Sequence, residues 1–362
     1  MTALYRELSA DETRRFGAAI DQLHGEVKQE LGQQDADYIR RIYRAVRYLG
    51  VLGRAALMLS FIPPFWFIGV AALALSKILD NMEVGHNVIH GQYDFMGDKH
   101  LNGKKYEWDI LGTSNNWRIT HNFKHHTYTN IEEHDEDIGY GFIRVFAEQK
   151  WNPWYLLQPL YTFFFAFTFQ WGVALQNLNF KPQPGINYLK HLTRQNPEAW
   201  HKMKWQLAKD YLVFPLLAGP MFLSVLAGNM VANVIRSLWT FIIIFCGHFT
   251  DKTVLFPASA IDENQPGQWY VRQVRGSSNI TGSRLFHLLS GNLSHQIEHH
   301  LFPDIPANRY AQLAPRVQAI CAEFGQTYNT GRLSVQFYQV IYAICRHALP
   351  SQPRPSEPAV SG

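Results

Sequence analysis

The sequence predicts an all-α integral membrane protein with four transmembrane helices arranged as two hairpins. Three observations support this fold class: long apolar stretches that lack charged side chains, turn residues that divide these stretches, and helical spacing of the polar residues around them. The mean hydropathy of −0.18 hides the pattern, because the 16 histidines and most charged residues lie between the apolar stretches. A local window is therefore the proper test of membrane insertion.

The first hairpin is expected in the N-terminal quarter of the chain. No charged side chain interrupts residues 55–76, and Pro63-Pro64 divides this part of the chain into spans of about 37–62 and 65–85. Arginines recur near helical spacing on the first span, so this helix is expected to lie partly along lipid headgroups. These arginines are Arg40, Arg44, Arg47 and Arg54.

The second hairpin is expected in the apolar region that ends near residue 250. Gly228-Asn229 predicts a tight turn between spans of about 208–228 and 230–250, and Arg236 would reach the headgroups from near the end of its span. Neither connecting turn contains Lys or Arg, which places both turns on the non-cytoplasmic side. The polar segments between the hairpins would then face the cytoplasm.

Composition argues against several other classes of protein. The net charge of +4 is mild and no basic block is interleaved with aromatic residues, so nucleic acid is not an expected partner. Cys246, Cys321 and Cys345 are far apart, so neither a disulfide framework nor a thiolate metal site is predicted. The polar N-terminal segment does not have the pattern of a cleaved secretion signal, and insertion is expected to depend on internal segments.

Three histidine clusters carry the strongest functional signal. In GHNVIH, the i, i+4 spacing places two imidazoles on one helix face, and the spacing HxxxHH then occurs twice in otherwise different sequences. Eight neutral imidazoles exceed what one four-coordinate zinc ion takes, so two metal ions are implied. Imidazole suits several transition metals, but open positions for oxygen favour iron over structural zinc. The eight candidate ligands are His86, His90, His121, His125, His126, His295, His299 and His300.

These clusters resemble the three histidine boxes of the membrane fatty acid desaturase family. HNFKHHTYTN and HQIEHHLFPDIP, with the acidic DED at 135–137, are most similar to actinobacterial NADPH-dependent stearoyl-CoA 9-desaturases. The resemblance covers about residues 40–345. It implies a di-iron centre and a cytoplasmic helical cap that holds the boxes above four transmembrane helices, in a desaturase domain of about residues 37–347.

Two further positions bear on the ligand set, one at the end of the fourth helix and one at the start of the third box. The resemblance implies a further ligand at the end of the fourth helix, where His248 stands, although a structural hydrogen bond at the membrane boundary is an equal alternative. The family pattern HxxHH would place the first ligand of the third box at Gln296, which shares a helix face with the two histidines that follow. We expect His295 instead, because imidazole is the better ligand. Asn292 follows Gly291 and is expected to be a turn residue rather than to hold a water near the metals.

The three boxes must lie on one face of the membrane to share a site. Three apolar blocks separate the second box from the third, so an odd number of crossings would divide the ligands. Because the last two blocks are expected to form a hairpin, the block at 151–178 should be interfacial or packed on the cap. Its tryptophans and glutamines suit that position, whereas hydropathy alone would make it a span.

The remaining segments are expected to support the site or the surface. The acidic run at 132–137 is expected to be a solvated loop, of which one or two carboxylates accept the second N–H of a liganding imidazole. Residues 1–36 should form a cytoplasmic surface helix capped by Ser9 with Glu12, and residues 348–362 a disordered tail. Two amphipathic helices separated by Gly331 are expected in the region from Pro306 to Cys345. Lipid headgroups, a CoA phosphate or an acidic electron donor are possible partners of Lys181, Lys190, Arg194, Lys202 and Lys204.

The resemblance implies an oxygen-dependent enzyme of the bacterial cell membrane that introduces a cis double bond into a long-chain acyl-CoA, stearoyl-CoA at the 9-position. No flavin, nucleotide, haem or iron–sulfur motif is visible, so electrons from NADPH should arrive through a separate flavin or iron–sulfur reductase or through ferredoxin. An acyl-lipid desaturase of other regiospecificity and a di-iron hydroxylase or ketolase stay open as alternatives. A histidine-rich metal carrier would need polar residues within the spans, which are nearly free of Asp, Glu and His.

Overall fold

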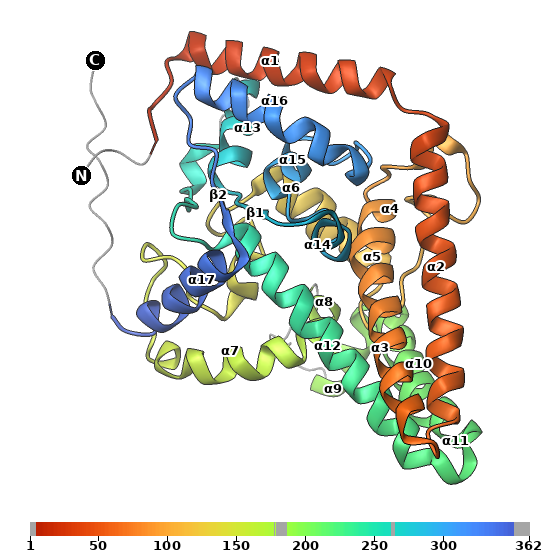
Figure 1. The fold of residues 1–362 in the computed structure, drawn as a ribbon. Helices are drawn as coiled ribbons and strands as arrows, with labels where there is room; N and C mark the ends of the chain where they lie inside the picture. Colours follow the sequence, from red (N-terminus) through yellow and green to blue (C-terminus); the bar gives the residue numbers. More distant parts are fainter. Residues whose placement is uncertain (1–4, 177, 179–186, 262–264, 351–362) are drawn as a thin grey trace.

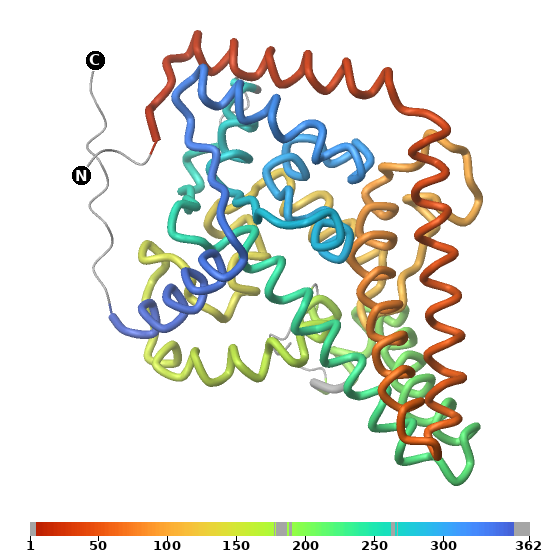
Figure 2. Tube along the Cα trace, viewed as in Figure 1, coloured from red at the N-terminus to blue at the C-terminus, as the bar shows by residue number. Residues whose placement is uncertain are grey.

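The computed structural model describes residues 5–176, 178, 187–261 and 265–350, which form an almost wholly helical protein (Figure 1). Long helices run from a broad helical cap to one narrow end of the molecule (Figure 2). The all-α prediction is confirmed for this part of the chain, where the strands β1 (Asn279–Thr281) and β2 (Thr330–Arg332) form one short parallel pair. Lys181 and most of the expected C-terminal tail lie outside the described residues.

The first helical hairpin consists of α2 (Gln33–Met58) and α3 (Pro63–Leu79). Pro63 occupies the first turn of α3, where a missing N–H costs nothing, so the chain turns where the sequence predicts. A glycine lets the two helices approach closely, because a Cβ on Gly53 would lie 2.7 Å from the backbone nitrogen of Leu73.

The prediction of a turn at Gly228-Asn229 is wrong. A single helix, α12 (Phe222–His248), runs through both residues, and the chain turns earlier, at Gly219, whose φ is +54°. Gly228 is a packing residue instead, because a Cβ there would lie 2.5 Å from the side chain of Leu57. Asn229 is buried and donates from Nδ2 to a backbone oxygen of the preceding helical run at 2.7 Å. The second hairpin therefore has one short and one long arm.

Arg236 does not extend toward headgroups as expected, because it is 1% exposed within α12. Its Nη1 donates to the backbone oxygen of Asp109 at 3.2 Å, and its Nη2 donates to Gln170. A buried guanidinium needs such partners, and hydropathy does not reveal them. These bonds tie α12 to the loop before the second histidine box and to α8 (Phe169–Leu175).

Two helices in the described residues are long and apolar enough to cross a membrane. They are Pro63–Ile89, with a mean hydropathy of 1.4, and Gly219–His248, with a mean hydropathy of 1.7. The helical run before Gly219 is interrupted. It comprises α9 (Tyr188–Gln195), α10 (Pro197–Ala208), the π-helical η6 (Lys209–Val213) and α11 (Phe214–Leu217).

The aromatic block expected at the interface forms no helix that could cross a bilayer core. A 3-10 turn at Pro153–Leu157 leads into α7 (Gln158–Phe167), and Thr168 separates α7 from α8. A transmembrane helix needs about 20 residues, which neither helix has. Trp154 is 73% exposed and Phe164 is 60% exposed, so the block presents aromatic rings on its outer side.

The cap is closed by α1 (Ala10–Gln29), which lies across the C-terminal segment (Figure 1). The capping box between Ser9 and Glu12 is present, as the sequence predicts. The apolar side chains of α1 are buried against α13 and α16 in a second hydrophobic core. The two predicted C-terminal helices are also confirmed. The cap helices are α13 (Pro266–Arg275), α14 (Arg284–Leu289), α15 (Gln296–Leu301), α16 (Tyr310–Glu323) and α17 (Leu333–His347).

Candidate metal centre

The first histidine box lies where α3 widens into a π-helical turn. The segment η1 (Asp80–His86) follows α3 directly and continues into α4 (Asn87–Ile89), with His90 as its C-cap. The two imidazoles of the box lie side by side, with ring centroids 4.9 Å apart. Gly85 lets the turn pass close to Trp108, because a Cβ there would lie 3.0 Å from that side chain. Such π-helical turns are rare and occur mostly at functional sites.

The second box explains why the spacing HxxxHH places three imidazoles together. It lies on the π-helical η3 (Arg118–His125), where the backbone N–H of His126 donates to the carbonyl of His121. In an α-helix, a residue at i+5 lies about 140° around the axis from residue i. The wider π turn, with its i to i+5 hydrogen bond, returns that residue to the same face. Both following histidines therefore share the side of the helix that His121 occupies.

The third box is built on an α-helix instead. On α15, Gln296, His299 and His300 stand at i, i+3 and i+4, and these positions share one face. His295 precedes the helix with a φ of −102° and a ψ of 57°, which are not helical values. The box therefore needs no π turn, and the α-helical register brings its glutamine to the site.

The expectation that His295 rather than Gln296 joins the site is not supported by the structure. The ring of His295 stacks on His287 with centroids 4.5 Å apart, away from the other boxes. The amide of Gln296 instead ends 2.9 Å from Nε2 of His248, and its oxygen has no hydrogen-bond partner in the described residues. Imidazole is the better ligand, but backbone geometry decides which side chain reaches the site.

The imidazoles converge in two adjoining clusters, in each of which ring nitrogens lie within 4.8 Å of one another. Nε2 of His86 lies 3.1 Å from Nε2 of His299, and Nε2 of His248 lies 3.2 Å from Nε2 of His300. His126 lies between the clusters, because its ring centroid is 4.4 Å from that of His300 and 4.8 Å from that of His299. Cluster 1 comprises His86, His90, His121 and His299, and cluster 2 comprises His125, His248 and His300.

Several ring nitrogens at this centre are buried and have no hydrogen-bond partner in the described part of the chain. A buried polar atom without a partner costs roughly 1–3 kcal/mol, so a group of them requires a further partner. Metal ions meet this requirement, because the unprotonated nitrogen of a neutral imidazole is a ligand for iron, copper and zinc. The residues therefore fit a pair of transition-metal ions. The atoms are Nε2 of His90, His121 and His125 and both ring nitrogens of His126.

The acidic run supports the second box, as the sequence predicts. Nδ1 of His121 lies 3.1 Å from Asp137, and Nδ1 of His125 lies 2.9 Å from one oxygen of Asp135 and 3.0 Å from the other. Each carboxylate accepts the N–H on the outer side of its ring, which leaves Nε2 unprotonated toward the centre. Both carboxylates are buried, so they belong to the centre rather than to a solvated loop.

Neutral groups support the other rings. The side-chain oxygen of Gln273 lies 3.0 Å from Nδ1 of His300, and the hydroxyl of Tyr310 lies 3.3 Å from Nδ1 of His299. Both partners lie on other helices, and no sequence pattern indicated them. Trp117 stacks on His121 with centroids 4.1 Å apart and is a further residue that the sequence analysis missed, although its i, i+4 spacing indicates the contact.

The environment favours the neutral form of most rings. Burial, reinforced by neighbouring imidazoles, holds the pKa values of His121, His299 and His300 well below the usual range. His125 differs, because burial lowers its pKa but Asp135 and Asp137 outweigh burial and raise it. Asp135 and Asp137 thus make His125 more basic than the neighbouring imidazoles, whose pKa values are lowered.

The structure also places two other residues that the sequence singled out. His248 lies in cluster 2, and its Nδ1 is 3.3 Å from the backbone oxygen of Gly276. Asn292 is a turn residue with a φ of +55°, and its Nδ2 donates to Glu83 at 2.9 Å. The interpretation of Asn292 as a turn residue is therefore confirmed.

Comparison with known proteins decides the family. Residues 60–332 match the family model described as fatty acid desaturase. The chain belongs to the fatty acid desaturase family. This desaturase is similar to the NADPH-dependent stearoyl-CoA 9-desaturase of Mycobacterium tuberculosis, with 39% identity over 357 residues, covering 96% of this chain and 83% of that protein. It is also 30% identical over 292 residues to the sn-1 linoleoyl-lipid 6-desaturase of Synechocystis sp., covering 74% and 76% of the two chains. No solved structure matches it.

Proposed function

We propose that this desaturase introduces a cis double bond into stearoyl-CoA at the 9-position, using molecular oxygen and two iron ions. The observation that carries the proposal is the convergence of inward-facing ring nitrogens from four separate segments. The name of the mycobacterial relative supports the acyl-CoA substrate, the carbon position and the use of NADPH.

Each cluster would hold one iron ion. Cluster 1 supplies four imidazoles, whereas cluster 2 supplies three imidazoles and the amide of Gln296, with His126 available between them. When bound, the iron pair would supply the oxidising power that removes hydrogen from an unactivated methylene. Two electrons, two protons and one oxygen molecule would balance the loss of two hydrogens, with two waters as products.

The protein's own residues would position the ligands and exclude water. His299 and His300 are 0% exposed, so bulk water does not reach the ring nitrogens of the third box. Asp135, Asp137 and Gln273 hold three of the rings in fixed orientations through their outer nitrogens. A buried and rigid ligand set prevents the oxidant from reacting elsewhere.

The membrane arrangement is also part of the proposal. Both helical hairpins would cross the bacterial cell membrane, which gives four spans, with the cap and the histidine boxes on the cytoplasmic side. The exposed aromatic rings of α7 would lie in the interface. Electrons from NADPH would reach the cap through a separate reductase or ferredoxin.

The direct test is conversion of stearoyl-CoA by the purified full chain with an NADPH-linked reductase. The expected product is the monounsaturated acyl-CoA, and mass spectrometry after derivatisation of the double bond should place it at carbon 9. A protein that holds two irons and yields no unsaturated product would refute the proposal.

The cyanobacterial relative favours a second candidate, a desaturase that acts on acyl chains of intact lipids. The two candidates differ in the acyl carrier. Parallel assays with stearoyl-CoA and with a distearoyl phospholipid would separate them, because each predicts product from only one of these substrates.

A further inference from the structure

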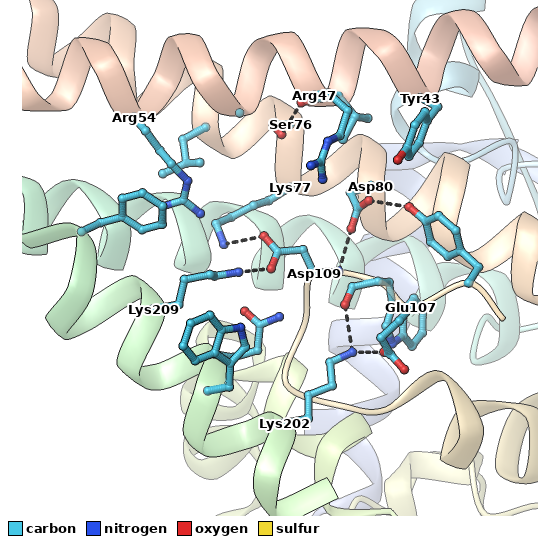
Figure 3. Close-up of a pocket in the computed structure, with 18 of the residues that line it drawn as sticks. Tyr43, Arg47, Arg54, Ser76, Lys77, Asp80, Glu107, Asp109, Lys202 and Lys209 are labelled. Carbon is cyan, nitrogen blue, oxygen red and sulfur yellow. Dashed lines mark hydrogen bonds and ion pairs between the residues drawn. The ribbon is translucent and has the colours of Figure 1, made fainter. Parts of the chain in front are cut away.

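A cavity of about 890 Å³ opens between α2, α3 and α10, beside the loop that precedes the second histidine box (Figure 3). Trp108 lines this cavity and packs against Trp117, which in turn stacks on His121, so two indole rings separate the cavity from the metal centre. The metal-site proposal uses none of the charged side chains in this cavity.

Most charges around the cavity are already paired. Nζ of Lys77 lies 2.8 Å from Asp210 and 3.6 Å from Asp109, and Lys209 donates to Asp109 as well. Lys202 donates to Glu107 on the opposite wall. These pairs join the spans to the cap and leave little lysine charge for a ligand. Figure 3 shows the pairs that involve Asp109 and Glu107.

Two arginines on α2 are paired less completely. Arg47 forms no hydrogen bond or ion pair with the described residues, and Arg54 has a buried Nη1 without a hydrogen-bond partner. The guanidinium of Arg54 stacks on Phe214 at 3.6 Å, and its Nη2 lies 3.4 Å from Asp210. Residues seven apart lie within about 20° around a helix, so both arginines extend from one face of α2 into the cavity (Figure 3).

The free donors suit one chemical group in particular. The planar guanidinium recognises phosphate oxygens with paired hydrogen bonds, and stacking on an aromatic ring fixes its plane. A phosphate between the arginines would pair with the unpaired guanidinium of Arg47 and with the cavity-facing side of Arg54 without breaking the pair that Lys77 forms with Asp210.

The surface beside these arginines is apolar. Val51 is 70% exposed, and Leu216 and Leu217 on α11 are 66% and 68% exposed. Figure 1 shows α11 at the narrow end of the hairpins, on the side away from the cap. An acyl chain attached to a phosphate at the arginines would therefore lie along the spans and would not approach the metal centre.

We infer that this cavity is a binding site for a membrane phospholipid, with its phosphate on Arg47 and Arg54 and its acyl chains against α2 and α11. The inference rests on the proposed membrane placement of the two hairpins. The bound lipid would fill the cleft at which the loop before the second box meets the spans.

Native mass spectrometry of the detergent-purified full chain tests this site. Dioleoyl phosphatidylglycerol is added to the wild type, to Arg47→Gln and to the double variant Arg47→Gln with Arg54→Gln. Arg41→Gln is the matched control, because Arg41 is exposed on the same helix but lies about 120° from Arg47. We expect one retained lipid per chain in the wild type and the control, a several-fold loss in Arg47→Gln and a larger loss in the double variant.

Dioleoylglycerol, which has the same chains and no phosphate, should not be retained. Equal lipid retention in all four proteins, or equal retention of dioleoylglycerol, would overturn the inference. Displacement of the lipid by one equivalent of stearoyl-CoA, with loss of stearoyl-CoA binding in Arg47→Gln, would also overturn it by making the cavity a substrate site. Arg47→Gln breaks no hydrogen bond or ion pair with the described residues, so it serves alone if the double variant misfolds. Desaturation and iron content are measured separately, so failure of the proposed function would not resemble failure of this site.

Discussion

The two imidazole clusters contain the same kind of ligand but differ in number and support. Cluster 1 has four imidazoles, whereas cluster 2 has three and an amide from Gln296. Cluster 2 in turn has the stronger outer support, because both oxygens of Asp135 face His125 and raise its pKa against the effect of burial. From this comparison we expect the cluster with fewer imidazoles to depend more on the groups behind them.

Removal of a ligand from cluster 2 should have the largest effect. His125→Ala leaves two imidazoles and an amide, so we expect the chain to lose at least one of two irons and nearly all desaturase activity. Iron per chain, measured by elemental analysis, and turnover of stearoyl-CoA check this expectation. His134→Ala is the control, because His134 is exposed in the same acidic loop. Normal turnover with two irons in His125→Ala would remove the second box from the site.

The sequence predicted the boxes because their spacing is a local property of helices. The same reasoning favoured His295, whereas the structure brings Gln296 toward His248, because the position of these side chains depends on where α15 begins and on its α-helical register. The second box has a similar spacing but lies on a π-helical turn, and no residue pattern in HNFKHH distinguishes the two backbones.

The membrane hairpins show a comparable limit. Pro63 is suited to the first turn of a helix by its fixed φ and missing N–H, so the first turn could be predicted from the sequence. From the sequence, Gly228 could be a turn residue or a packing residue. Only its close contact with Leu57 on α2 shows that it is a packing residue. Arg236 likewise depends on Gln170, a contact between distant segments that no local window contains.

Substitution of the outer carboxylates should have an intermediate effect that differs between the clusters. Asp135→Asn removes the charge nearest to His125, and Asp137→Asn removes the charge nearest to His121. Loss of such an outer partner typically lowers metal affinity about 10–100-fold. We expect the loss of iron affinity in Asp135→Asn to lie near the upper end of this range, because cluster 2 has one imidazole fewer. The loss in Asp137→Asn should lie near the lower end.

Iron retention against a graded series of chelator concentrations measures both affinities. Equal affinity in the two variants, or the larger loss in Asp137→Asn, would contradict the view that cluster 2 depends more on its outer support. Thermal unfolding of the metal-free proteins serves as the control for a general loss of stability.

The smallest effect is expected for the amide of cluster 2. Gln296→Ala removes a side chain that ends 2.9 Å from His248, so iron affinity should fall by about tenfold at cluster 2 and remain unchanged at cluster 1. His295→Ala is the matched control from the same box, and we expect it to keep both irons and full activity because its ring packs on His287 instead. Mössbauer spectroscopy distinguishes the two iron environments and would show which one changes. Iron loss in His295→Ala with none in Gln296→Ala would reverse the assignment of the third box, because it would mean that the box adopts a π-helical turn when the metals are bound.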